Sequence, residues 1–96
     1  MIIHIVMFQF KDENKQNNIS LVKARLEALV TKIDPLVFIE VGIDFNQSER
    51  AFDLSLYSKF NTLEDLKIYA VHEEHLKVLK LIREVTVESK VVDYEI

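Results

Sequence analysis

Residues 2–10 read Ile-Ile-His-Ile-Val-Met-Phe-Gln-Phe, and this stretch decides which folds are possible. One set of alternate positions holds Ile3, Ile5 and Met7, and the other holds His4, Val6, Phe8 and Phe10. Both faces of an extended strand would therefore be apolar, which is typical of a strand covered from two sides. The residues from Lys11 to Asn18 are polar and predict a loop.

A helix is predicted after this loop, with Asn18 or Ser20 as its N-cap. Its apolar residues recur in steps of three and four and so form one stripe: Ile19, Val22, Leu26, Leu29 and Ile33. The helix is expected to end at Asp34-Pro35, because a residue that precedes proline is pushed out of the α region.

Two strands are predicted next. The first covers residues 37–45, with apolar residues on one face and an interruption at Gly42, which indicates a bulge or a close backbone approach. Residues 46–49 predict a hairpin loop into the second, where Phe52, Leu54 and Leu56 alternate with Asp53, Ser55 and Tyr57.

A second helical region and a last strand complete the chain. Asn61 followed by Glu64 is a capping-box pattern, which opens a helix through Leu63, Leu66 and Tyr69. The helical pattern continues to Ile82, and Val71-His72 is the place where a break would fall. Residues 86–96 are β-branched and alternating, and they predict a fourth strand.

The predicted order is βαββαβ, in a single α+β domain of residues 1–96. Such units form a ferredoxin-like, four-stranded antiparallel sheet with both helices on one face. Ile3, Ile5 and Met7 would then face water on the other side unless a second sheet covered them. We therefore expect a homodimer through the open sheet face, in which two sheets form an α/β barrel. The alternative is a monomer that tolerates three exposed apolar residues.

The composition argues against several classes of function. A net charge of −4 disfavours nucleic-acid binding, which needs clustered Lys and Arg. The absence of cysteine removes disulfides and thiolate chemistry. The apolar N-terminal segment is too short for a membrane span and lacks the basic region of a signal peptide, so we expect no membrane partner and a cytoplasmic protein.

Five segments in the right order resemble the stress-responsive A/B barrel (Dabb) family. They are residues 4–8, 39–42, 48–54, 69–75 and 91–94. The segment Tyr69-Ala-Val-His72-Glu-Glu-His75 is similar to the family's Tyr-x-x-His-Pro-x-His signature, but Glu73 stands where the family commonly has proline. The resemblance implies a ferredoxin-like monomer that dimerises into an α/β barrel.

The same resemblance says less about function. One plant branch of the family is a polyketide cyclase that closes an aromatic ring by intramolecular aldol condensation, with a Tyr and a His that match Tyr69 and His75. Other members are stress-associated proteins with no settled chemistry. Membership therefore predicts the fold better than the function.

The histidines and Tyr69 are the candidate catalytic residues. His4 and His75 could move protons near neutral pH, and Tyr69 could stabilise an enolate oxygen. Tyr69 and His75 meet only if the helix breaks near His72, and His4 joins them only if its strand face looks toward the helices. Ligand contacts are then expected from His72 and from an apolar set between sheet and helices: Val6, Phe8, Phe10, Leu54 and Leu56.

Each of these residues also has a structural interpretation. A strand-borne His4 can be a core histidine, and a helix histidine beside Glu73 and Glu74 can be a cap or part of a solvated face. His72 and His75 could share a metal with His4 or a glutamate, but a chain without cysteine is poorly suited to structural zinc. We therefore expect no metal and no cofactor.

Three functions stay open at this point. The first is a small dimeric protein that binds a hydrophobic molecule, with Tyr69 and His75 as the acid–base pair of a cofactor-free enzyme of polyketide-cyclase type. The second is a non-enzymatic stress-response dimer whose histidines only pack. The third is a monooxygenase or haem-handling protein of the related dimeric barrel type.

Overall fold

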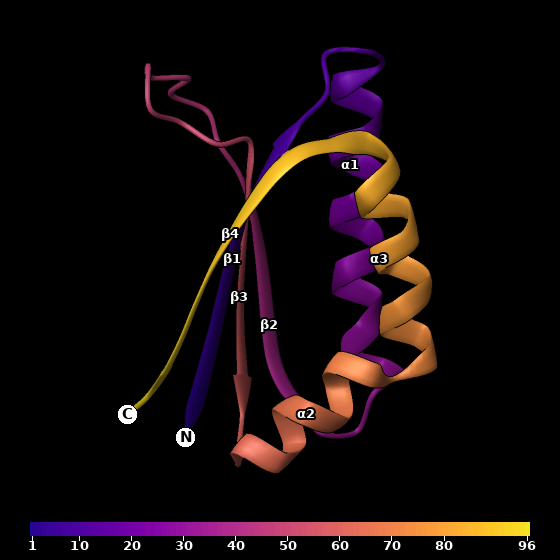
Figure 1. The fold of residues 1–96 in the computed structure, drawn as a ribbon, viewed down its shortest axis with the longest axis vertical. Helices are drawn as coiled ribbons and strands as arrows, with labels where there is room; N and C mark the ends of the chain where they lie inside the picture. Colours follow the sequence, from indigo (N-terminus) through magenta and orange to yellow (C-terminus); the bar gives the residue numbers. More distant parts are fainter.

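The structure is a computed structural model that describes all 96 residues, and its elements follow the predicted order (Figure 1). The strands are β1 (Ile2–Phe10), β2 (Leu36–Ile43), β3 (Leu54–Phe60) and β4 (Thr86–Glu95). The helices are α1 (Lys15–Glu27), a 3₁₀ turn η1 (Ala28–Thr31), α2 (Leu63–Val71) and α3 (Glu73–Val85). The second helical region is therefore two helices that meet at His72.

The four strands form one antiparallel sheet in the order β2-β3-β1-β4. His4 in β1 lies opposite Ser58 in β3 and Asp93 in β4, and paired residues share a face of the sheet. The His4 face looks toward the helices, because Phe8 and Phe10 on the same face belong to the buried core. The predicted ferredoxin-like sheet, with its helices on one face, is confirmed.

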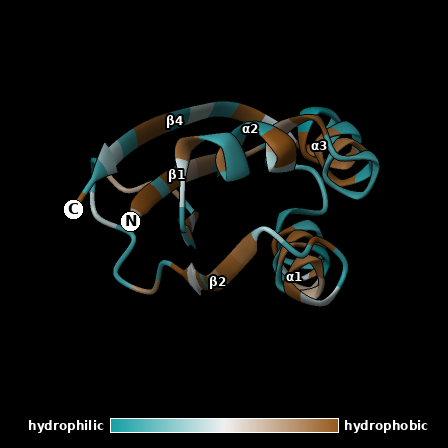
Figure 2. Cartoon of the chain, turned by 90° about the horizontal axis from the view of Figure 1, so that it is seen from below, coloured by the Kyte–Doolittle hydropathy of each residue, from teal (hydrophilic) through white to brown (hydrophobic).

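The core lies between this sheet face and the helices. The whole predicted stripe of the first helical region is buried there, from Ile19 to Ile33. Figure 2 shows α1 and α3 beside each other, with the strands to one side of them and hydrophobic stretches in β1, β2 and β4. This packing fixes which residues of β1 can reach the helices.

The helix boundaries differ from the predicted ones. α1 begins at Lys15, within the predicted loop, after Asn14 in a left-handed conformation with φ of 54°. Its last turn tightens into η1, so the helix ends before Asp34-Pro35 is reached. At the start of α2 the cap is Thr62, whose hydroxyl accepts a hydrogen bond from the backbone N–H of Asp65, and not Asn61.

The strand boundaries also need correction. β2 ends at Ile43 rather than at residue 45, and Phe45 is 93% exposed. The bulge in β2 falls at Val37, where the register with β3 shifts, and not at Gly42. A Cβ atom at Gly42 would meet no atom within 4 Å, so no close backbone approach requires glycine there. β3 begins at Leu54, two residues after the predicted start.

The sheet has one uncovered face, and β2 and β4 are its edge strands. β4 pairs only with β1, and nearly all of its residues are exposed. On the face turned away from the helices, four apolar residues are exposed, with Ile5 half-buried among them: Met7, Phe38, Val92 and Tyr94. Ile3 is fully buried on this face by its neighbours. No helix of the chain is long and apolar enough to cross a membrane.

Candidate functional site

The break between α2 and α3 creates the candidate site. His72 is extended, with φ of −64° and ψ of 138°, so the chain leaves α2 and enters α3 across one residue. The rings of Tyr69 and His75 consequently lie 4.2 Å apart between centroids, although a continuous helix would point them in different directions. The helix thus breaks at His72, which is the condition under which the sequence predicts that Tyr69 and His75 meet.

Tyr69 occupies the centre of the site. Its side chain is 1% exposed, and its ring also contacts Phe60 at 5.0 Å and His4 at 6.3 Å between centroids. The phenolic Oη is buried and has no hydrogen-bond partner. Burial raises the pKa of the Tyr69 phenol well above its usual range, so the group stays protonated as a donor. A buried hydroxyl without a partner is uncommon in proteins and requires an explanation.

His75 is held in one tautomer. Its Nδ1 lies 3.0 Å from the carbonyl oxygen of Ala70, which can only accept a hydrogen bond, so Nδ1 carries the hydrogen. Burial lowers the pKa of His75, and the hydrogen bond to Ala70 opposes this shift in part. Proximity to His4 and His72 lowers it further. At neutral pH, His75 is thus a neutral imidazole whose Nε2 has a free lone pair.

His4 approaches from the sheet and has a partner of its own. Its Nδ1 is hydrogen-bonded to the carboxylate of Asp93, directly opposite on β4. The carboxylate accepts, so the hydrogen lies on Nδ1 and Nε2 is left for another partner. The sequence had indicated His4 but not Asp93 as a site residue, because pairing between β1 and β4 depends on a register that the sequence does not display.

His72 uses its side chain at the helix junction. Its Nδ1 accepts a hydrogen bond of 3.0 Å from the backbone N–H of Glu74 and so caps α3. Glu73 takes the first position of α3, and the helix begins there without the proline that the family commonly has. No ring contact joins His72 to Tyr69 among the aromatic contacts found. A ligand contact by His72 stays a prediction.

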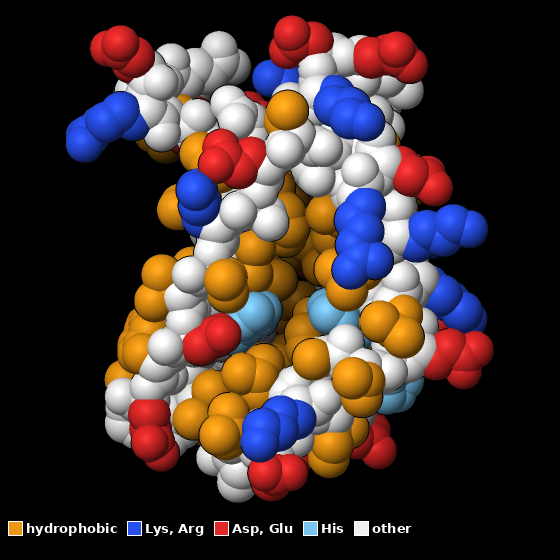
Figure 3. Space-filling model, viewed as in Figure 1, with side chains coloured by type: hydrophobic (Ala, Val, Ile, Leu, Met, Phe, Trp, Pro, Cys, Tyr) orange, Lys and Arg blue, Asp and Glu red, His pale blue; other side chains and the backbone are white.

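The apolar residues predicted to contact a ligand fall into two groups. Phe8, Leu54 and Leu56 are packed in the core, together with Phe10. Val6 is only partly buried against that core, next to His4 on the same strand face. Figure 3 shows a hollow between the strands and the helices, with hydrophobic side chains inside it and histidines at its rim. Val6 is the one member of the predicted set that the core does not bury, and a ligand contact by any of them stays a prediction.

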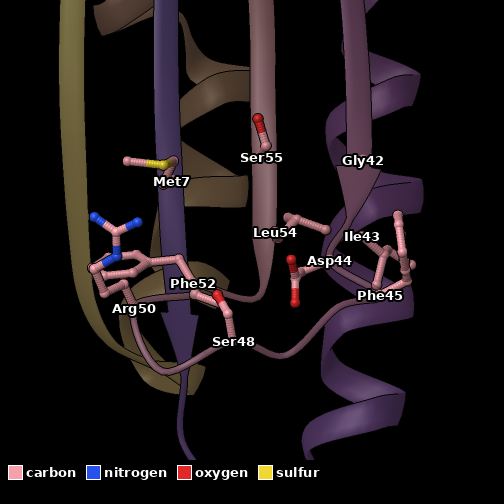
Figure 4. Close-up of a pocket in the computed structure, with 11 residues that line it drawn as sticks. Met7, Gly42, Ile43, Asp44, Phe45, Ser48, Arg50, Phe52, Leu54 and Ser55 are labelled. Atoms are coloured by element: carbon pink, nitrogen blue, oxygen red, sulfur yellow. The ribbon is translucent and has the colours of Figure 1, made fainter.

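Two further cavities lie elsewhere. The larger, of about 470 Å³, is formed where the loop after β2 meets the uncovered sheet face, and it includes Met7, Gly42 and Arg50 (Figure 4). The smaller, of about 290 Å³, is polar and includes Lys15 and Asp53. Neither contains Tyr69, His75 or His4. The histidine site is identified by its polar groups and not by cavity volume.

A metal site needs several side chains whose ligand atoms converge on one point. No group of three or more His, Asp or Glu side chains is placed to hold a metal ion. His72 and His75 each direct Nδ1 at a backbone group, in the hydrogen bonds with Glu74 and Ala70.

Comparison with known proteins places this chain in a family. Residues 2–96 match the model of the Stress responsive A/B Barrel Domain family. The chain belongs to this family, as the resemblance in its sequence implied. It is 33% identical over 81 residues to a stress-response A/B barrel domain-containing protein of Arabidopsis thaliana, and the match covers 83% of this chain but only 30% of that relative.

Solved structures share the fold. A dimeric protein of unknown function with a ferredoxin-like fold, from Bacteroides fragilis, is 37% identical, with a TM-score of 0.91 over 99% of this chain and 95% of that one. A hydroxynitrile lyase from Passiflora edulis is 21% identical, with a TM-score of 0.86 over 97% of this chain and 90% of that one. The second likeness concerns the fold alone.

Proposed function

We propose that this chain binds a small hydrophobic carbonyl compound beside Tyr69 and catalyses proton transfer on it without a cofactor. The observation that carries the proposal is the Tyr69 hydroxyl, which is buried without a partner on a ring that neighbours those of His75 and His4. A bound carbonyl oxygen would supply the missing acceptor. An unpaired donor in a low-dielectric site is also well suited to a charge that develops on that oxygen.

In the proposed step, Nε2 of His75 takes a proton from a carbon next to the carbonyl group. The C–H bonding electrons move to form an enolate, and the hydroxyl of Tyr69 donates a hydrogen bond to its oxygen. His75 then returns the proton to the same or another atom, so the chemistry balances without an oxidant or a metal. Both groups start neutral, which avoids burying a permanent charge in an apolar site.

His4 is proposed to contact the ligand from the sheet side. Asp93 fixes the hydrogen on Nδ1, so Nε2 of His4 presents either a lone pair or, when His4 is charged, a second N–H. Val6 lies two residues along the same strand face and would contact apolar parts of the ligand. His4 and Val6 would thus orient the molecule against Tyr69.

We also propose that two copies associate through the uncovered sheet face. Support comes from the exposed apolar residues on that face, which a second sheet would cover: Met7, Phe38, Val92 and Tyr94. The Bacteroides fragilis relative is dimeric and shares 37% identity over nearly the whole chain. The two candidate sites would then lie on the outer, helix-bearing sides of the two sheets.

A second candidate function is a non-enzymatic stress-response dimer. The tight packing of Phe8, Leu54 and Leu56 favours it, because these residues fill the core and neither of the two cavities of about 470 and 290 Å³ adjoins the histidines. In that case Tyr69 and the histidines would serve the fold only. The two candidates differ in whether the site moves protons on a ligand.

The test is proton exchange in D₂O, with a panel of hydrophobic ketones and 1,3-diketones followed by NMR. The wild type should speed deuterium uptake at the carbon next to the carbonyl of at least one compound. Tyr69→Phe and His75→Asn should each slow it by roughly 10²–10⁴-fold, the usual contribution of a general acid or base. Leu21→Ala, on the exposed side of α1, should match the wild type. Equal rates in all four proteins would refute the enzymatic proposal.

A further inference from the structure

No proline or glycine causes the one-residue break between α2 and α3 at His72. The only proline of the chain is Pro35 and the only glycine is Gly42, so no residue between 69 and 75 breaks a helix by its own backbone. Tyr69 to Val71 belong to α2 and Glu73 begins α3, and fusion of the two would give one continuous helix. Something other than backbone restriction must therefore hold the break.

The break leaves backbone groups that need partners. The first N–H groups of α3 and the last carbonyl groups of α2 have no partner within their own helices. The imidazole of His72 accepts from the N–H of Glu74, and the imidazole of His75 donates to the carbonyl of Ala70. Two side chains thus satisfy the two sides of the junction.

His72 is the one of the pair that acts at the junction alone. His75 also lies against Tyr69, whereas the hydrogen bond found for the His72 side chain is the cap of α3. A cap of this type favours an extended residue followed by a new helix, which is the backbone of His72. The cap fixes where α3 begins and therefore the direction in which it runs. In this direction His75, the third residue of α3, lies against Tyr69.

We infer that His72 is a positioning residue, whose Nδ1 caps α3 and thereby holds the ring of His75 against that of Tyr69. The inference rests on the proposed function, since the position of the two rings matters only if they act on a ligand. The sequence predicts that His72 contacts a ligand. The positioning role instead requires that Nδ1 of His72 accept the hydrogen bond from Glu74, and it requires no contact with a ligand.

The experiment compares substitutions that keep or lose the acceptor. In His72→Asn, the amide oxygen occupies the place of Nδ1 and can accept from Glu74. In His72→Gln the acceptor lies one bond further from the backbone, and in His72→Ala it is absent. Thr62→Ala removes the cap at the other end of α2 and serves as a matched control.

The readout is NMR of the protein without a ligand, whereas the proposed function is tested by proton exchange on a ligand. Failure of the positioning role can therefore be distinguished from failure of the proposed function. His72→Asn and Thr62→Ala should keep the ring-current shift of the His75 protons that Tyr69 causes. His72→Gln and His72→Ala should lose it, and amide exchange at Glu74 should become about fivefold faster, as expected for a lost helix cap. If His72→Ala does not fold, the Asn and Gln variants decide. An unchanged His75 shift in His72→Gln, or its loss in His72→Asn, would overturn the inference.

Discussion

The rings of Tyr69 and His75 lie 4.2 Å apart at an angle of 39°, although six residues separate them in the sequence. The contact exists because α2 ends and α3 begins around a single extended residue. It brings a buried phenol without a hydrogen-bond partner next to an imidazole that burial keeps neutral. Each group of this pair therefore has a measurable effect on stability.

Removing the Tyr69 hydroxyl should stabilise the free protein. A buried donor without a partner costs free energy, so Tyr69→Phe should raise the free energy of unfolding by about 1 kcal/mol. Urea denaturation at pH 7.5 measures the change. A loss of more than about 1 kcal/mol would mean that the hydroxyl bonds to another group of the protein. The proposed role of Tyr69 requires that the same variant lose its activity while it gains stability.

His75 should make the protein less stable in acid. Its pKa is lowered in the folded chain, so below about pH 6.5 the unfolded chain binds a proton that the folded chain does not yet accept. The free energy of unfolding should therefore fall as the pH drops from about 6.5 to the lowered pKa, and stay level below it as far as His75 is concerned.

The matched variant for this prediction is His75→Asn. Its amide nitrogen can still donate to the carbonyl of Ala70, but it does not titrate. Unfolding curves between pH 8 and 5 should show a smaller loss of stability in this variant than in the wild type. Identical pH profiles would show that folding does not shift the titration of His75.

Asp93 should control the tautomer of His4. With the carboxylate present, the hydrogen of neutral His4 lies on Nδ1. Asp93→Ala should release this preference and let both tautomers form, which ¹⁵N shifts of the imidazole nitrogens report directly. Because the side chain of Asp93 is 48% exposed, the loss of stability should stay below about 1 kcal/mol. A large loss of stability with an unchanged tautomer would assign Asp93 to the fold instead.

Ile5→Asp should separate the proposed dimer. The carboxylate would be trapped without a partner between two sheets, at a cost of about 3 kcal/mol, or on the order of 100-fold in the dissociation constant. Leu21→Asp, on the exposed side of α1, is the control and should leave association unchanged. Light scattering at micromolar concentration measures both. A wild-type protein that is monomeric under these conditions would contradict the proposal.

Most of the fold and part of the site could be predicted from the sequence. Alternating residues in β1 correctly predicted a strand with two apolar faces, since side-chain direction follows from the backbone alone. Helix ends were less well predicted, because Asn14 begins α1 without a side-chain cap and Thr62 caps α2 although the neighbouring Asn61 has the stronger capping preference. Asp93 was missed as a partner of His4 because strand register is decided by packing across the whole sheet.

Strand β1 contributes residues both to the proposed histidine site and to the proposed dimer interface, one on each of its faces. His4 and Val6 point to the helices, while Ile3, Ile5 and Met7, in the positions between them, point the other way. Deleting a single residue from the middle of β1 would exchange the two sets over half the strand. An imidazole would then sit where two copies are proposed to meet, and an isoleucine beside Tyr69. An insertion or deletion in the middle of β1 would therefore damage both self-association and the site in one event.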